Sequence, residues 1–463
     1  MFRCRALAKT HWAAGTLLLL LCISVRGAAQ TQPGNQRPNV VLIITDDGGY
    51  GDTGPYGAPD IKTPNIDQLA KEGVKLVNFY AEPVCTPTRV SLISGRYPSR
   101  FSLERPIGNG GAADEQGLLP NGRSLPQLLK NNGYATGLVG KWHLGRKPQF
   151  SPNAHGFDYF WGFLTGFSDY YNHTAGDGMD DLFENNKPIK EDGYLTDLIT
   201  KHAIQFIDRS AQQPFFLEVA YNTPHWPWQP PDHPSVAANH GNMTSPGSDS
   251  PESVRATYVA MMERADQGVG QILKELDKYR LGQNTIVIFT NDNGGEWLSR
   301  NDPFFHRKDT LWEGGIHVPA IMRWPNHFPR GATNAQVGHM FDLNASILAA
   351  TTTSVPAEAK PDGMNIFPIL EGKAAPVERT LFWRIVTPGR QQKVVRKGDW
   401  KLLLDGPQIL LYNVKTDLGE RTDMAARRQD IVASLRPLIA QWERDVDAGK
   451  TPPRGQRGGG RGE

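Results

Sequence analysis

Residues 39–45 read Asn39-Val40-Val41-Leu42-Ile43-Ile44-Thr45, an apolar run without polar alternation, and the chain then continues with Asp46-Asp47-Gly48-Gly49. A continuous run of β-branched and apolar residues is typical of a strand that is buried on both faces of a parallel sheet. The two carboxylates stand where such a strand leaves the sheet. The run therefore predicts a central strand of an α/β fold with a polar site beyond its carboxyl end.

The same arrangement recurs three times along the chain. The apolar stretch 136–140 ends in Lys141-Trp142-His143, the stretch 215–220 ends in Tyr221-Asn222-Thr223-Pro224-His225, and the stretch 285–290 ends in Asn291-Asp292-Asn293. Helical patterns separate these stretches, which predicts a mostly parallel sheet flanked by helices. One polar strand end would mean little, because polar residues often follow strands. Four ends that carry carboxylates, amides, lysine and histidine predict a functional site at one edge of the sheet.

A second block of sequence begins near Pro376. Four short runs at residues 381–386, 391–396, 400–404 and 409–414 predict a small antiparallel sheet, and the amphipathic residues 431–442 predict one helix. We expect a linker at residues 30–37, a catalytic domain at 38–375, a small C-terminal α+β domain at 376–448 and a disordered Gly/Arg-rich tail at 449–463. The insert from Gln229 to Ser250 is rich in Pro, Ser and Asn and is expected to form one wall of the pocket.

The first 29 residues have the pattern of a signal peptide. Basic residues precede the short apolar run 17–25, and the small residues Gly27-Ala28-Ala29 follow it. The pattern predicts a secreted or periplasmic protein without a membrane span after cleavage. Of the three cysteines, Cys4 and Cys22 lie in this segment, so that the mature chain keeps Cys85 alone and forms no internal disulfide. A net charge of +2 gives no reason to expect nucleic acid as a partner.

Cys85 opens the stretch Cys85-Thr86-Pro87-Thr88-Arg89, which begins a helix. We expect Thr86 to cap this helix, Pro87 to occupy its first position and Gly95 to end it. The free N–H groups and the dipole at a helix N-terminus favour an anion, and Arg89 lies one turn further on the same face. A capped helix beside a small buried cysteine is the plainer interpretation, but it leaves Arg89 and the polar strand ends unexplained.

The polar strand ends offer oxygen ligands for a metal ion. Asp46, Asp47, Asp292 and Asn293 form an all-oxygen set that suits a hard cation, with Ca²⁺ favoured over Mg²⁺ because clustered carboxylates suit its higher coordination number. No thiolate or histidine cluster favours zinc. The remaining polar residues carry the opposite charge, and this mixture predicts an anionic substrate beside the metal. These residues are Arg89, Lys141, His143, His225 and Lys308.

At this point the motifs resemble those of a known family. Cys85-Thr86-Pro87-Thr88-Arg89, followed by Ser94-Gly95-Arg96, resembles the signature of formylglycine-dependent sulfatases, in which Cys-x-Pro-x-Arg directs conversion of the cysteine to formylglycine. Residues 140–145 resemble the second signature and residues 308–315 a third, while Leu411-Tyr412-Asn413 matches a late segment of the family. The resemblance extends from about Pro38 to the C-terminal helix and implies an alkaline phosphatase-like fold.

The resemblance implies a role for each matching residue. Asp46, Asp47, Asp292 and Asn293 would bind the metal together with Cys85 modified to formylglycine (3-oxoalanine). Arg89 and Lys141 would hold the formylglycine, and His143, His225 and Lys308 would surround the sulfate and its leaving oxygen. A formylglycine-generating enzyme or maturase is the implied partner. One departure is His317, where relatives often have arginine, and we expect it to tune the site from outside.

The implied chemistry assigns proton transfers to these residues. A hydrated aldehyde carries two hydroxyl groups, of which one attacks sulfur with Asp292 as the base. His225, aided by Lys308, protonates the leaving alcohol, and His143 then helps to deprotonate the second hydroxyl so that sulfate is expelled. The aldehyde re-forms, so that no water has to attack sulfur.

Two other functions remain open from the sequence. One is a phosphate or phosphonate monoesterase of the same superfamily, and the other is a non-catalytic polysaccharide-binding relative. Within the sulfatases, the segments around residues 140–158 and 301–303 look most like galactosamine-6-sulfatases and arylsulfatase A-like enzymes, which favours a sulfated carbohydrate over a small aryl sulfate as the substrate. Trp226 and Trp228 next to His225 could stack on a sugar or could anchor their loop.

Overall fold

The computed structural model describes residues 37–232, 251–448 and 450. The predicted signal peptide, the linker up to residue 36, residues 233–250 of the insert and the tail apart from residue 450 lie outside these residues. In the described part of the chain, no helix has both the length and the apolar character that a membrane crossing requires. The proposed domain boundary at residues 375 and 376 stays a prediction.

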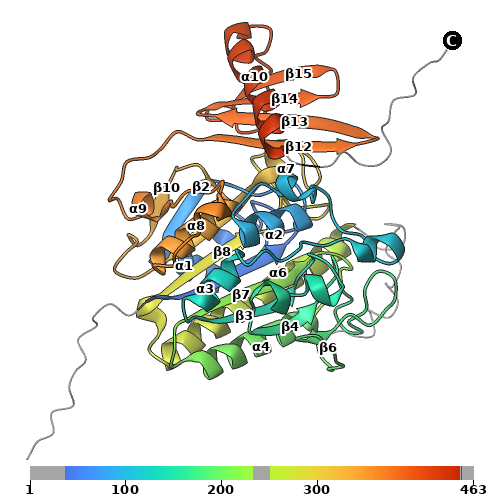
Figure 1. Ribbon diagram of the computed structural model, residues 1–463, viewed down its shortest axis with the longest axis vertical. Coiled ribbons are helices and arrows are strands. Elements are labelled where there is room, and N and C mark those ends of the chain that lie inside the picture. The colour runs from blue at the N-terminus through green and yellow to red at the C-terminus, as the bar shows by residue number, and fades with distance from the viewer. Residues whose placement is uncertain (1–36, 233–250, 449, 451–463) are drawn as a thin grey trace, which may run out of the picture. The chain divides into compact units, whose positions relative to one another are not determined.

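The larger sheet has eleven strands and mixed direction (Figure 1). Its centre consists of five neighbouring strands in the order β8, β1, β7, β3 and β4, which run parallel to one another. The strand β9 is antiparallel to both of its neighbours, β8 and β2. The expectation of a mixed, mostly parallel sheet is therefore confirmed. The order across the sheet is β10 (Ala332–Asn334), β2 (Val74–Tyr80), β9 (His317–Arg323), β8 (Thr285–Asn291), β1 (Asn39–Asp46), β7 (Phe215–Pro224), β3 (Ala135–Lys141), β4 (Tyr159–Phe163), β5 (Phe183–Glu184) and β6 (Lys187–Pro188), with β11 (Gly338–His339) paired to β2.

Helices cover both faces of this sheet, as the continuous apolar strands require (Figure 1). In β1, Val40, Leu42 and Ile44 pack into a core that includes α2, α3 and α8. The alternating Val41 and Ile43 pack into a second core that includes α1, α4 and α6. The helices are α1 (Pro64–Glu72), α2 (Cys85–Ser94), α3 (Leu125–Asn131), α4 (Leu195–Ser210), α6 (Pro251–Lys278), α7 (Glu313–Ile316), α8 (Met340–Ala350) and α9 (Phe367–Leu370). Short 3₁₀ helices lie at Gly54–Tyr56, Pro98–Phe101, Gly111–Glu115, Pro148–Phe150, Asn153–His155, Gly282–Asn284 and Ala357–Ala359.

A second sheet follows in the C-terminal part of the chain. Its four strands are antiparallel and in sequence order, namely β12 (Thr380–Thr387), β13 (Arg390–Lys397), β14 (Trp400–Asp405) and β15 (Gln408–Asn413). The helix α10 (Gln429–Val446) packs on this sheet through Leu435 and Ile439. The predicted small antiparallel sheet with one helix is confirmed, and the helix extends beyond the predicted residues 431–442 at both ends.

Candidate active site

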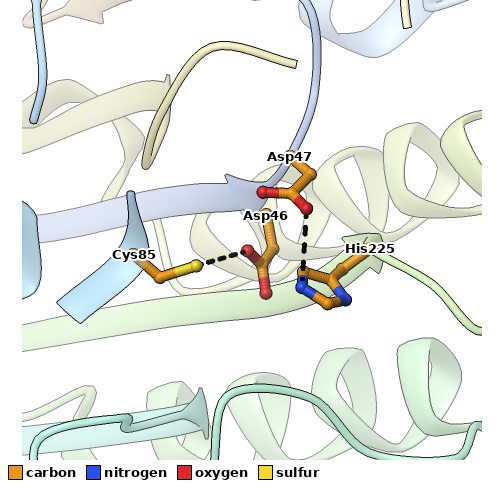
Figure 2. Close-up of side chains that lie close together, drawn as sticks. All are labelled: Asp46, Asp47, Cys85 and His225. Atoms are coloured by element: carbon orange, nitrogen blue, oxygen red, sulfur yellow. Dashed lines mark hydrogen bonds and ion pairs between the residues drawn. The ribbon is translucent and has the colours of Figure 1, made fainter. Parts of the chain in front are cut away.

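The carboxyl ends of four parallel strands meet at one edge of the larger sheet. β1 ends at Asp46, β3 at Lys141, β7 immediately before His225, and β8 immediately before Asp292. Figure 2 shows Asp46 and Asp47 between the side chains of Cys85 and His225. The candidate residues Asp46, Asp47, Asp292, Asn293, Lys141, His143 and His225 are all buried at this edge. The sequence grouped them because parallel strands deliver their carboxyl ends to the same side.

Cys85 is the first residue of α2, and only 2% of it is exposed. Its Sγ lies 3.6 Å from Asp46 Oδ1. Burial raises the pKa of the Cys85 thiol to about 12, although Lys141 and Lys308 oppose the rise. A thiol with such a pKa stays protonated at neutral pH and is a poor nucleophile. The unmodified side chain is therefore badly suited to attack an ester, whereas its position at the N-terminus of α2 suits an anionic group.

The start of α2 differs from the sequence expectation. Val84, and not Thr86, occupies the N-cap position, so that Pro87 is the third residue of the helix. The Thr86 hydroxyl instead donates to the backbone oxygen of His143 at 3.0 Å and accepts from Ile107 N at 3.2 Å. These contacts tie the helix start to two other loops of the site. The hydroxyl therefore positions Cys85 relative to His143 and is not available as a cap.

Two buried basic side chains, Lys141 and Arg89, pair with carboxylates of the site. Lys141 Nζ is 2.5 Å from Asp46 Oδ2, and both side chains are fully buried. Arg89 Nη2 is 3.1 Å from Asp292 Oδ2, while its Nη1 donates to Lys141 O at 3.0 Å. Each carboxylate thus has its own cation, which offsets the cost of burying the charge.

Asp47 contacts two further candidate residues, Lys308 and His225. Lys308 Nζ lies 2.7 Å and His225 Nε2 lies 3.4 Å from Asp47 Oδ2. Burial alone would raise the pKa of Asp47, but Lys308, His225 and Lys141 together hold this pKa well below its usual range. Asp47 is therefore ionised. Lys308 comes from a loop between β8 and α7, so that the third sequence motif joins the other two in space.

The two candidate histidines have different surroundings. His225 Nδ1 donates to Trp226 O at 2.6 Å, which leaves Nε2 facing Asp47. Burial lowers the pKa of His225 to about 3, and Asp47 opposes this change. His143 Nε2 donates to Ile107 O at 3.0 Å, and its buried Nδ1 has no hydrogen-bond partner. Burial and the nearby Lys141 hold the pKa of His143 well below its usual range, so that Nδ1 offers a free lone pair.

The oxygen atoms at this edge fit a divalent cation. One ligand atom from each of Asp46, Asp47, Cys85 and His225 lies within 4.8 Å of the others. Asn293 donates through Nδ2 to Asp47 Oδ1 at 2.7 Å, while its buried Oδ1 has no hydrogen-bond partner. An orphaned amide oxygen beside clustered carboxylates is a ligand set of the kind that Ca²⁺ and Mg²⁺ take. Burial, together with Asp292 and Asp47, also raises the pKa of Asp46, a repulsion that a cation would remove.

Sequence reasoning missed two carboxylates of this region. Glu218 lies in the middle of β7, where burial raises its pKa to about 7 and Arg89 opposes the rise. A charged residue inside an otherwise apolar strand was the signal for it. Glu296 Oε2 lies 4.0 Å from Lys308 Nζ, and Glu296 lines a hollow with Asp47 and His225. Its place three residues after Asn293 could have indicated this position.

His317, where the sequence departs from the family pattern, is a buried residue of the larger sheet. His317 begins β9, and its Nδ1 is 2.9 Å from Glu313 Oε2. Its Nε2 lies 2.9 Å from the backbone oxygen of Val77. His317 therefore belongs to a buried network between the two sheets, and the expected influence on the site stays a prediction.

Comparisons with known proteins agree with this geometry. Residues 38–353 match the family model described as Sulfatase. The chain is 35% identical to the N-acetylgalactosamine-6-sulfatase of Canis lupus familiaris over 390 residues, which cover 79% of this chain and 71% of that protein. It is 32% identical to Arylsulfatase G of Homo sapiens, with 89% and 88% covered. The solved structure described as Ps i-CgsB in complex with k-i-k-neocarrahexaose is similar with a TM-score of 0.81 at 31% identity, covering 89% of this chain and 94% of that chain.

Proposed function

The chain belongs to the formylglycine-dependent sulfatase family and hydrolyses sulfate esters, and from this premise we propose that it desulfates carbohydrates through a formylglycine made from Cys85 beside a bound Ca²⁺. The observation that carries the proposal is the position of Cys85. It lies buried at the start of α2, within reach of Asp46 and near Lys141 and Lys308, as a thiol that is too weak an acid to react itself. An aldehyde at the same position would supply, in its hydrated form, a hydroxyl nucleophile and a second hydroxyl for release of the sulfate.

We propose that Asp46, Asp47, Asp292 and Asn293 hold the cation, together with the modified Cys85. The orphaned Oδ1 of Asn293 supports this assignment, as does the raised pKa of Asp46, which results from burial and from repulsion by Asp292 and Asp47. Ca²⁺ is preferred to Mg²⁺ because the ligands are clustered carboxylates with an amide oxygen. When bound, the cation would neutralise charge on the sulfate and on the nucleophile.

The remaining residues would bind the sulfate and move protons. Arg89 pairs with Asp292 and Lys141 pairs with Asp46. Both basic residues would orient the modified side chain of residue 85. Lys308 would contact the sulfate, and Asp292 would accept the proton of the attacking hydroxyl. His225 would donate a proton from Nε2 to the leaving oxygen, since its Nδ1 is already committed to Trp226 O. The partner-free Nδ1 of His143 would accept the proton of the second hydroxyl.

A sulfated carbohydrate is the proposed substrate class, with a small aryl sulfate as a simpler alternative. The names of the similar N-acetylgalactosamine-6-sulfatase and of the complex with neocarrahexaose support a carbohydrate. Trp228 packs against two apolar clusters, and Trp226 lies 4.1 Å from the ring of Phe167, which supports a loop-anchoring role for both. We also propose export after signal-peptide cleavage and maturation by a formylglycine-generating enzyme or maturase.

The test combines chemistry at Cys85 with a substrate comparison. Native protein should contain an aldehyde at position 85, detected by mass spectrometry and by reaction with a hydrazide probe. Cys85→Ala should lose sulfate release from nitrophenyl sulfate and from sulfated disaccharides while it keeps the wild-type melting temperature, because Cys85 forms no disulfide. A thiol at position 85 in fully active protein would refute the mechanism. Faster release from nitrophenyl phosphate than from nitrophenyl sulfate would favour a phosphatase instead.

A further inference from the structure

An exposed tryptophan stands beside the site. Trp297 is 63% exposed, and it is the one aromatic among the large apolar side chains exposed in the described part of the chain. It lies in the loop that follows Asp292 and Asn293. It lines the same hollow as Asp47, His225 and Trp226. The indole is therefore exposed beside the hollow that His225 lines.

Arg307 covers part of this indole. Its guanidinium carbon lies 4.5 Å from the centre of the Trp297 ring. The next residue along the chain is Lys308, which contacts Asp47. Lys308 forms an ion pair with Asp47, and Asp309 forms ion pairs with Arg105 and Arg390. Arg307 has no ion pair with a described residue. Burial raises the pKa of Glu296, and Lys308 and Arg307 oppose the rise, so that Glu296 lies near Arg307 without forming an ion pair. A stacked guanidinium without an ion pair is weakly hydrated and keeps hydrogen-bond donors for an anion.

Charges of both signs lie near Arg307, and two further arginines are among them. Burial lowers the pKa of the adjacent His306, and the nearby Arg307 and Arg390 lower it further, while Asp405 opposes the change. Arg105 and Arg390 share one carboxylate, that of Asp309, so that these three residues of the rim together carry one net positive charge. An anionic ligand would be attracted to this rim.

We propose that Trp297 and Arg307 form a subsite for the sugar unit that adjoins the one carrying the reacting sulfate. The pyranose ring stacks on the indole, and a sulfate or carboxylate of the same unit pairs with the guanidinium, whose fork geometry suits both groups. This subsite rests on the proposed carbohydrate substrate. It implies that the enzyme prefers an anionic oligosaccharide to a lone sulfated sugar or an aryl sulfate.

Binding is measured on the Cys85→Ala protein, so that no substrate is consumed. The probes are tetrasaccharides of chondroitin 6-sulfate, its carboxyl-reduced form and ι-carrageenan, which separate a carboxylate from a sulfate on the neighbouring unit. Adding Trp297→Ala should weaken the best-bound probe by about tenfold, and adding Arg307→Ala should remove the preference for the charged neighbour together with much of the salt dependence. The matched control is Trp400→Ala, because Trp400 also stacks under an arginine, Arg428 at 5.2 Å, but on β14 of the second sheet.

Equal affinities in the Trp297→Ala and Trp400→Ala proteins would overturn the proposal, as would failure of all three tetrasaccharides to bind. The second measurement is enzyme kinetics on protein in which Cys85 is intact. Trp297→Ala should raise the KM for a cleaved tetrasaccharide about tenfold more than the KM for nitrophenyl sulfate. A rise of the same size for both substrates would show that Trp297 acts on the site's structure. Failure of the proposed function would give a different result. A wild-type protein that binds these probes through Trp297 yet releases no sulfate would contradict the proposed catalysis and leave the subsite supported.

Discussion

His225 has only one ring nitrogen from which a proton can be transferred. Its Nδ1 donates to the backbone oxygen of Trp226 at 2.6 Å, and its Nε2 lies 3.4 Å from the ionised Asp47. Burial holds the pKa of the ring near 3, which keeps the ring neutral, while Asp47 favours the charged form. A bound sulfate ester adds a further negative charge beside Nε2. We therefore expect the ring to acquire its proton when the substrate binds.

His225→Ala should lose far more activity on a sulfated sugar than on nitrophenyl sulfate. A sugar alkoxide is a poor leaving group that needs a proton, and general acids contribute roughly a hundredfold to ten-thousandfold, whereas nitrophenolate leaves without help. The matched control is His143→Ala, which removes a second buried histidine of the site. It should slow both substrates to the same extent, since its proposed role follows departure of the alcohol. The ratio of the two rates in each variant is the measurement, and an unchanged ratio in His225→Ala would leave this residue as a sulfate-binding group only.

Removal of divalent cations should abolish sulfate release. The unpaired Oδ1 of Asn293 and the repulsion between the carboxylates of Asp46 and Asp292 support the proposed cation site. Added Ca²⁺ should restore activity and raise the melting temperature, because an ion that binds only the native state stabilises it. Asn293→Ala should raise the Ca²⁺ concentration that is needed for half-maximal recovery. An enzyme that contains no metal by elemental analysis and resists chelators would contradict the assignment.

At the scale of elements, the sequence predicted which strands meet but not how the loops between them are held. Continuous apolar runs placed Asp46, Lys141 and Asp292 correctly, because strand direction fixes the edge to which carboxyl ends project. The cap at Thr86 was wrong, since its hydroxyl bonds to the distant residues His143 and Ile107. Such contacts depend on tertiary structure and leave no local pattern. Glu82 was missed although its partners Thr88 and Ser91 follow it within the same stretch of sequence, because its burial depends on the tertiary structure.

Glu82 lies between β2 and α2, where it is buried against the start of the catalytic helix. Ser91 Oγ donates to its carboxylate at 3.3 Å, and the Thr88 hydroxyl accepts from its backbone N–H at 3.0 Å. Burial raises the pKa of Glu82 to about 8, and the charge of Glu104 contributes to the rise. The native carboxyl therefore keeps its proton at pH values at which the unfolded chain has lost it, so that stability falls as the pH rises from about 4.5 through 8.

Glu82→Gln should remove this pH dependence. The neutral amide still accepts from Ser91 and has no proton to lose, so that the variant should be more stable than wild type at pH 8 by a few kcal/mol, with about 1.4 kcal/mol for each unit of the pKa difference. At pH 4 the two proteins should have similar free energies of unfolding. Urea unfolding across this range is the measurement, and the exposed Glu115→Gln is the control. The same slope with pH in wild type and Glu82→Gln would show that the Glu82 carboxyl ionises normally.

At the scale of the molecule, the two sheets share an apolar core. Tyr80, Ile316 and Phe341 of the larger part pack in one cluster with Trp383 and Val394 of the smaller sheet. Trp383 Nε1 also donates at 2.9 Å to the backbone oxygen of Ala81, four residues before Cys85. The smaller sheet therefore supports the segment that leads into α2. We expect the two sheets to unfold in one transition, since neither side of this core is complete alone.

A fully buried ionic network crosses the same junction. Lys401 Nζ on β14 lies 2.9 Å from Glu313 Oε1 and 2.8 Å from Glu420 Oε1, and Glu313 also accepts from the Tyr80 hydroxyl at 2.7 Å. Burial raises the pKa of Glu420 to about 7, with Lys401 opposing the rise, while the cations around Glu313 hold its pKa well below the usual range despite its burial. Lys401 thus pairs with two carboxylates that are shielded from water.

Lys401→Met should destabilise the protein by about 3–5 kcal/mol, because removal of one partner leaves buried charge without compensation. The double variant Lys401→Met/Glu420→Gln should be more stable than Lys401→Met, since it removes one of the two stranded carboxylates while Glu313 keeps its bonds from Tyr80 and His317. The control is Lys415→Met, which breaks an exposed pair with Asp399 and should change stability by less than about 1 kcal/mol. Urea unfolding followed by tryptophan fluorescence measures all three. Equal midpoints for Lys401→Met and Lys415→Met would mean that the shared apolar core alone joins the two sheets.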